Sequence, residues 1–125
     1  MKLYELAEKY REVIYAIFNK DGEKIWGFKV RDYTSELRYR FCEDIANIVN
    51  TLSKEMDVNT AFEYIYECLM WLDNYVIKDC ETARKWVEDR LEYGYIDRTE
   101  EFKVYNEVIN LLCERLKEEK EVEIE

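Results

Sequence analysis

The sequence contains no proline, histidine or glutamine, and it has only three glycines. Histidine is the usual acid–base group near neutral pH and the commonest metal ligand in proteins. Its absence excludes histidine-dependent nucleophilic triads and the di-iron helical bundles that pair Glu with His. No GxxxxGK or GxGxxG pattern occurs, so a glycine-rich phosphate-binding loop is excluded as well.

Long apolar runs are also missing, and no stretch approaches the roughly 18 residues of a membrane span. The first ten residues, MKLYELAEKY, carry two acids early and no apolar core, unlike a signal peptide. We therefore expect a cytoplasmic protein without a membrane partner. The chain has 125 residues, 48% of them hydrophobic, and is predicted to fold as a single domain over residues 1–125.

Four cysteines are present, and no two have the CxxC spacing of a zinc site. In a reducing cytosol they are predicted to be reduced, apolar core residues, and we expect neither a metal nor another cofactor. In a hyperthermophile disulfides would be possible, with three connectivities. The four are Cys42, Cys68, Cys80 and Cys113.

The stretch over residues 62–77 is predicted to be the central helix, because its apolar residues form two adjacent stripes at helical spacing. A helix that is apolar nearly all round belongs in the interior of a protein. The first stripe is Phe62, Ile65, Leu69, Leu72 and Val76. The second stripe is Tyr64, Cys68, Trp71 and Tyr75.

Residues 2–11 have the periodicity of an amphipathic helix, but residues 12–30 are ambiguous. They could continue this helix, which would give an all-α five-helix bundle. However, two β-prone runs flank residues 19–22, whose sequence NKDG suits a type I turn closed by a left-handed glycine. We favour a β-hairpin over residues 12–30.

Four amphipathic helices are predicted after Tyr33. Asp32 or Thr34 would cap the first, and capping boxes over residues 60–63 and 97–100 would open the second and fourth. Asp79 would cap the third, with Gly94 as its stop. The tail over residues 119–125 is predicted to be frayed coil or a short edge strand. The predicted fold class is α+β, mainly α: an N-terminal short helix and β-hairpin followed by a compact bundle of four amphipathic helices.

Acids outnumber bases by 29 to 19, a net charge of −10. Such a chain repels phosphates, so no direct nucleic acid binding is expected, whereas a basic partner would be attracted. Residues 20–40 carry six bases and four acids, a net of +2, and the remaining residues therefore carry −12. This bipolar distribution favours head-to-tail self-association as a homo-oligomer, or a two-sided partner.

Carboxylates are the abundant reactive groups, and one set suggests an enzyme. Glu88, Asp89 and Glu92 resemble the first acidic cluster of the MazG-type pyrophosphatases, helical bundles whose acids hold Mg²⁺. The resemblance implies an Mg-dependent nucleotide pyrophosphatase as one alternative. The second cluster of that family, ExxD on a following helix, is absent, because Glu114 and Glu118 are spaced differently.

The aromatic content, eleven Tyr and three Trp, is more informative, since several tyrosines fall outside the predicted stripes. Tyr and Trp are enriched at protein interfaces. The composition resembles that of small proteins of phages and other mobile elements, which include anti-restriction and anti-CRISPR inhibitors. This resemblance implies a non-enzymatic inhibitor that occupies the nucleic-acid groove of a host protein. A self-associating structural or adaptor protein is another alternative. The candidate partner-binding residues are Glu88, Asp89, Glu92, Tyr93, Tyr95, Asp97, Glu100 and Glu101.

Overall fold

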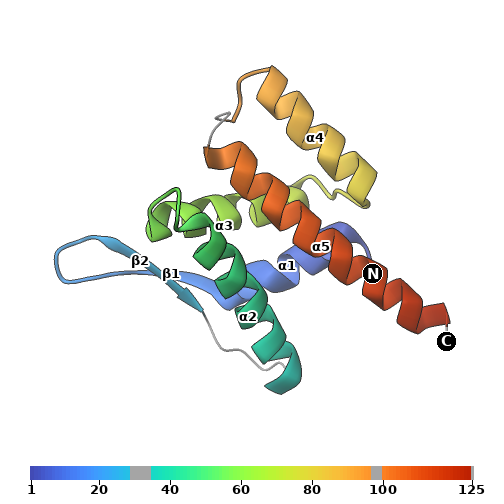
Figure 1. The fold of residues 1–125 in the computed structure, drawn as a ribbon, viewed down its shortest axis with the longest axis horizontal. Helices are drawn as coiled ribbons and strands as arrows, with labels where there is room; N and C mark the ends of the chain where they lie inside the picture. Colours follow the sequence, from blue (N-terminus) through green and yellow to red (C-terminus); the bar gives the residue numbers. More distant parts are fainter. Residues whose placement is uncertain (29–34, 97–99, 125) are drawn as a thin grey trace.

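The structure, a computed structural model, describes residues 1–28, 35–96 and 100–124. It contains a short helix, a two-stranded antiparallel hairpin and four further helices (Figure 1). The predicted fold class is therefore confirmed. The elements are α1 (Leu3–Val13), β1 (Ile14–Phe18), β2 (Lys24–Phe28), α2 (Ser35–Leu52), α3 (Val58–Asn74), α4 (Cys80–Glu92) and α5 (Glu100–Ile124).

The hairpin begins directly where α1 ends, at the β-branched pair Val13 and Ile14. Gly22 has a φ of +83°, the left-handed conformation that the turn requires. The side chain of Asn19 accepts hydrogen bonds of 2.9 Å from the amides of Asp21 and Glu23 and fixes the turn. The predicted hairpin is correct because these local signals agree with one another.

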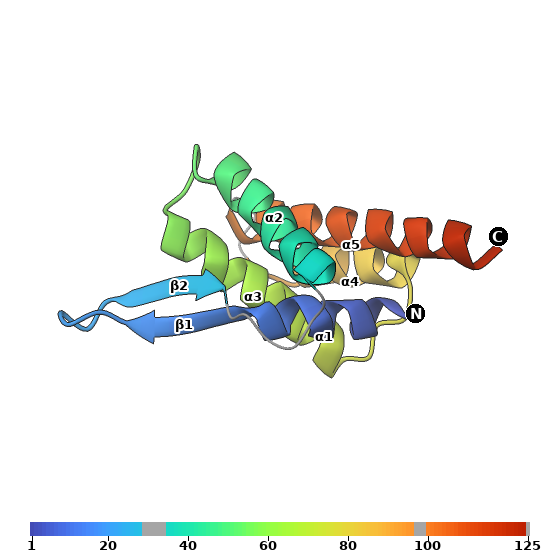
Figure 2. The same cartoon turned by 90° about the horizontal axis from the view of Figure 1, so that it is seen from below.

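The core is organised around α3, which packs against α1, α2, α5 and β2. Phe62, Ile65, Leu69 and Leu72 are buried, as the first stripe predicts, but Val76 is exposed and follows the helix with a φ of +52°. Figures 1 and 2 show α5 running along α4 and across the other helices, with the hairpin extending beyond them.

Helix α1 has no side-chain cap at its N-terminus, where Lys2 holds the capping position. The amides of Leu3 and Tyr4 instead donate to the carbonyls of Lys78 and Ile77, at 3.1 and 3.0 Å. These bonds satisfy two of the donors that a helix start leaves free. They also fasten the beginning of the chain to the segment between α3 and α4.

One predicted capping box is wrong. The box over residues 60–63 would start the central helix after Thr60, but α3 already begins at Val58. Asp57 is its cap, and the Asp57 carboxylate accepts from the amide of Thr60 at 3.3 Å. Asp79 caps α4 as predicted, through the amide of Thr82 at 2.8 Å. The predicted caps Asp32, Thr34 and Asp97 lie outside the described residues.

The C-terminal tail also differs from the prediction. It is neither coil nor edge strand, because α5 continues as a helix to Ile124. Its straight-chain Glu and Lys residues have high helix propensity, which outweighs the alternation of charged and apolar residues. None of the helices in the described ranges is long and apolar enough to cross a membrane.

The cysteine prediction is wrong for one pair. Cys80 and Cys113 form a disulfide, with a Cα–Cα distance of 5.9 Å, that joins the start of α4 to α5. Cys68 is buried as a free thiol, as predicted, and Cys42 is half-buried. Burial raises the pKa of the Cys68 thiol, which makes it unreactive near neutral pH.

Candidate protein-binding surface

The predicted acidic residues divide into two groups by exposure. Glu88, Asp89 and Glu92 are exposed on α4, where they lie opposite the buried residues Ala83 and Val87. Glu88 and Glu92 are four residues apart and therefore share one face of the helix. The exposed carboxylates of this region thus gather on the outer face of α4.

The remaining predicted residues lie in and after the connection from α4 to α5. Tyr93 and Tyr95 are 73% and 70% exposed. Glu100 and Glu101 are half-buried at the start of α5, and Asp97 lies outside the described residues. The two tyrosines are therefore the most accessible apolar groups beside the acids of α4.

A group of aromatic side chains lies between the end of α3 and α4. Trp71 and Tyr75 stack with ring centroids 5.3 Å apart, and the ring of Tyr75 lies 6.2 Å from that of Trp86. Tyr75 is 53% exposed, while the two tryptophans are half-buried. Trp71, Tyr75, Trp86, Arg90 and Tyr95 are called the aromatic surface below.

Arg90 occupies the centre of the aromatic surface. Its guanidinium carbon lies 5.4 Å from the ring centre of Trp71, 5.1 Å from that of Trp86 and 5.6 Å from that of Tyr95. These are cation–π distances, and they hold a long side chain in one place. The Nε of Arg90 is buried and has no hydrogen-bond partner among the described residues.

The aromatic surface rests on a buried tyrosine. Trp86 stacks on Tyr105, with ring centroids 5.9 Å apart and an interplanar angle of 11°. The phenol of Tyr105 donates to the Glu67 carboxylate at 2.5 Å. Burial, and next this hydrogen bond, raises the pKa of the Tyr105 phenol above its ordinary value of about 10. The phenol stays neutral, and the exposed rings lie on a fixed support.

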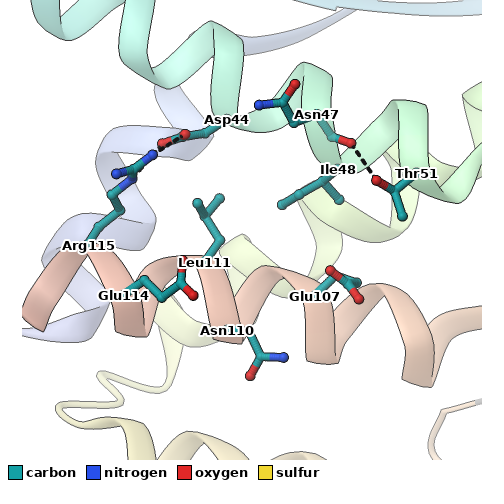
Figure 3. A pocket seen from close by; sticks show the side chains of 9 residues that line it. All are labelled: Asp44, Asn47, Ile48, Thr51, Glu107, Asn110, Leu111, Glu114 and Arg115. Carbon is teal, nitrogen blue, oxygen red and sulfur yellow. Dashed lines mark hydrogen bonds and ion pairs between the residues drawn. The ribbon is translucent and has the colours of Figure 1, made fainter.

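A groove of about 430 Å³ separates α2 from α5 (Figure 3). The ion pair between Asp44 and Arg115 lies at one end, and Ile48 and Leu111 form its apolar part. Asp44 is only 6% exposed and also accepts a hydrogen bond from Tyr10. Asp44 and Arg115 therefore find their partners within the protein, and their place in the groove is explained by their role in joining α2 to α5.

The sequence reveals only part of the aromatic surface. Tyr95 is among the predicted residues, but the helical pattern places Trp71 and Tyr75 in the interior and Trp86 on the inner face of its helix. The spacing of four residues between Trp71 and Tyr75, and between Trp86 and Arg90, is the available signal. It shows which rings share a helix face but not that the two helices meet along those faces.

No metal centre is evident: within the described ranges, no group of three or more His, Cys, Asp or Glu side chains is placed to hold a metal ion. The chain matches no known protein family, and comparisons with curated proteins and with solved structures give no significant match.

Proposed function

We propose that the protein is a small, acidic, non-enzymatic protein-binding protein that engages its partner through the aromatic surface and the outer face of α4. The observation that carries this proposal is the exposure of Tyr75 and Tyr95, 53% and 70%, around Trp71, Trp86 and Arg90. Trp, Tyr and Arg are the residue types that dominate binding hot spots. A partner that covers these rings would gain both their apolar area and a preorganised guanidinium.

The proposed partner is a nucleic-acid-binding host protein whose basic groove the protein occupies, as an inhibitor from a phage or other mobile element would. The net charge of −10 and the exposed carboxylates of Glu88, Asp89 and Glu92 support this choice. Helix α4 also carries Arg84, Lys85 and Arg90, so its charge falls far below that of duplex DNA. Aromatic contacts must therefore supply much of the affinity.

The proposed compartment is the cytoplasm. The disulfide between Cys80 and Cys113 is compatible with this compartment in a hyperthermophile. Intracellular proteins of hyperthermophiles keep disulfides, whereas most other cytosolic proteins do not. A host of that kind is therefore the first place to look for the partner.

Affinity capture from such a host, followed by mass spectrometry, would identify the partner. The purified partner would then be titrated against the wild type, Tyr95→Ala and the triple variant E88K/D89K/E92K. We expect each variant to weaken binding by about tenfold or more. Tyr39→Ala is the matched control, because Tyr39 is 69% exposed on α2, and it should leave the affinity unchanged.

Two further readouts separate the parts of the proposal. Binding should weaken with added salt, but less steeply than the binding of duplex DNA to the same partner. A complex that still binds nucleic acid would refute groove occupancy and leave the protein-binding role. An affinity that ignores Tyr95→Ala, the charge reversal and salt would refute groove occupancy and the proposed binding surface.

A second candidate function, a self-associating structural or adaptor protein, is favoured by a different observation. The hairpin leaves Ile17, Phe18 and Ile25 exposed by 48%, 68% and 40%, away from the aromatic surface. A protein that self-associates but captures no partner from the host would fit this candidate rather than the inhibitor.

A further inference from the structure

The two strands of the hairpin have different surroundings. β2 contacts α3, where Trp26 packs on Tyr66 and Phe28 on Phe62, with ring centroids 5.7 and 5.8 Å apart. In β1 only Ile14 is buried, and the next four residues are exposed. Because the described sheet has two strands in the order β1–β2, β1 presents an unpaired outer edge.

This edge lacks the features that usually prevent pairing with another chain. Lysine, proline and bulges are the common protections of an edge strand. The five residues of β1, IYAIF, include no charged residue and no proline, and their register with β2 is unbroken.

One face of the hairpin is covered and the other is not. Residues that are paired across two strands lie on the same face of the sheet. Trp26 and Phe28 pack on α3, so their partners in β1, Ala16 and Ile14, also lie on the face toward α3. The opposite face carries Tyr15, Ile17 and Ile25, which are 36%, 48% and 40% exposed. β1 therefore combines a free edge with an exposed apolar face.

Charge indicates the occupant of this edge. Residues 14–28 carry two bases and two acids, a net charge of zero, so the rest of the chain, with 17 bases and 27 acids, carries the whole net charge of −10. Two copies of such a molecule repel each other through their helices. The hairpin itself carries no net charge, so a second copy is repelled least when it approaches there.

We infer that β1 pairs antiparallel with β1 of a second copy, which makes a four-stranded sheet across a two-fold axis. This inference deepens the second candidate function, self-association, and does not depend on the proposed inhibitor function. With Ala16 opposite Ala16 of the second copy, all five residues of β1 are paired, and Tyr15 lies opposite Ile17 of the other chain. The exposed apolar faces of the two hairpins then form one continuous surface.

The backbone is consistent with this register. The amide of Asn19 donates to the carbonyl of Glu23 at 2.9 Å, and hydrogen-bonded pairs alternate along an antiparallel ladder. By this alternation, the N–H and C=O groups of Ala16 and Phe18 point away from β2, toward the outer edge of the sheet. These groups are the ones that the proposed pairing joins.

Sedimentation velocity over a wide concentration range tests the inference. The wild type should change from monomer to dimer as its concentration rises. Ile17→Lys places a charge on the shared face, and Ala16→Pro removes an outward N–H group, so each should weaken dimerisation by at least about tenfold. Val58→Lys, at a 45% exposed position on α3, is the matched control and should leave the dimer intact. Ile17→Lys decides the question if Ala16→Pro fails to fold.

Cross-linking tests the register. Opposed residues of a hydrogen-bonded antiparallel pair have Cα atoms about 5.5 Å apart, within the reach of a disulfide. In a Cys42→Ser background, Ala16→Cys should oxidise to a covalent dimer much faster than Ile25→Cys, which lies on the inner strand and is 40% exposed. Equal rates for the two variants would overturn the pairing.

Other outcomes would also overturn the inference. A wild type that stays monomeric at every concentration would leave this face to a different protein, and a dimer that survives Ile17→Lys would place the contact elsewhere. The test is separate from that of the proposed function, because Tyr95→Ala should dimerise normally and Ile17→Lys should keep its affinity for the partner.

Discussion

The phenol of Tyr10 donates a 2.5 Å hydrogen bond to the carboxylate of Asp44 and so joins α1 to α2 inside the core. Asp44 also receives a 2.9 Å hydrogen bond from Nε of Arg115 on α5. One carboxylate, 6% exposed, therefore connects three helices that are distant in sequence.

Replacing Asp44 by Ala should lower the free energy of unfolding by roughly 2–4 kcal/mol, because it leaves Arg115 and Tyr10 without their shared partner. Tyr10→Phe should lower it by about 1 kcal/mol, since Arg115 still satisfies the carboxylate. Urea denaturation measures both. The control is Asp73→Ala, which removes a more exposed ion pair with Arg11 and should change stability by less than about 1 kcal/mol. Similar losses for Asp44 and Asp73 would contradict the structural role of the network.

Tyr10 and Tyr105 should ionise at a higher pH than an ordinary tyrosine. Burial, and next the hydrogen bonds to Asp44 and Glu67, raises the pKa of Tyr10 and Tyr105 above the ordinary value of about 10. The folded state therefore holds protons that the unfolded state loses, so their contribution to stability is complete below about pH 10 and declines above it.

Absorbance at alkaline pH should show that Tyr10 and Tyr105 ionise only above the ordinary range of tyrosine, together with unfolding. Tyr10→Phe and Tyr105→Phe should each remove one of these late groups, whereas Tyr39→Phe should leave both in place. Ionisation of both phenols in the ordinary range while the protein is folded would refute their burial.

Leu69 is fully buried on α3, and Leu69→Ala should lower the free energy of unfolding by roughly 2–5 kcal/mol. Val58→Ala, on the same helix but 45% exposed, should change it by less than about 0.5 kcal/mol. Thermal or urea denaturation would show the difference. A midpoint that barely moves for Leu69→Ala would mean that α3 is not at the centre of the core.

The disulfide should be a major source of stability. It links residues 33 positions apart, and a loop of that length corresponds to about 3–4 kcal/mol in the chain-entropy description. Reduction should lower the denaturation midpoint, and the double variant Cys80→Ser/Cys113→Ser should show the same loss without responding to reductant. Thiol counting in denaturant should find two thiols before reduction and four after it. Four thiols before reduction would show that the disulfide is absent.

The sequence predicted the parts of the fold that local chemistry determines. The turn over residues 19–22, the cap at Asp79 and the buried stripe of α3 each depend on a few neighbouring residues. The predicted start of α3 was wrong because two capping signals lie close together, and Asp57 caps the helix earlier than the Thr60 box would. The pairing of Cys80 with Cys113 depends on how α4 docks along α5, which no spacing in the sequence reports.

The candidate surface was predictable to a lesser degree. Exposure of Tyr93 and Tyr95 followed from their position outside the predicted apolar stripes, and the acids of α4 followed from helical periodicity. The role of Trp71 and Trp86 could not be predicted. The sequence shows that each lies on an apolar helix face, but it does not show which part of that face the neighbouring helices leave uncovered. Asp44 was missed for a related reason. It lies near Phe41 and Ile45 in the sequence, and its charge is satisfied by residues of α1 and α5 that no local pattern identifies.

The position of Arg115 and Cys113 in the last helix has a consequence for synthesis. As the chain leaves the ribosome, α1, α3 and α4 emerge before α5, which packs against all three of them. Asp44 and Cys80 have no access to their partners until Arg115 and Cys113 have been translated. The ion pair and the disulfide should therefore form only after α5 has been synthesised, and a nascent chain that stalls before residue 113 should be a substrate for chaperones and proteases.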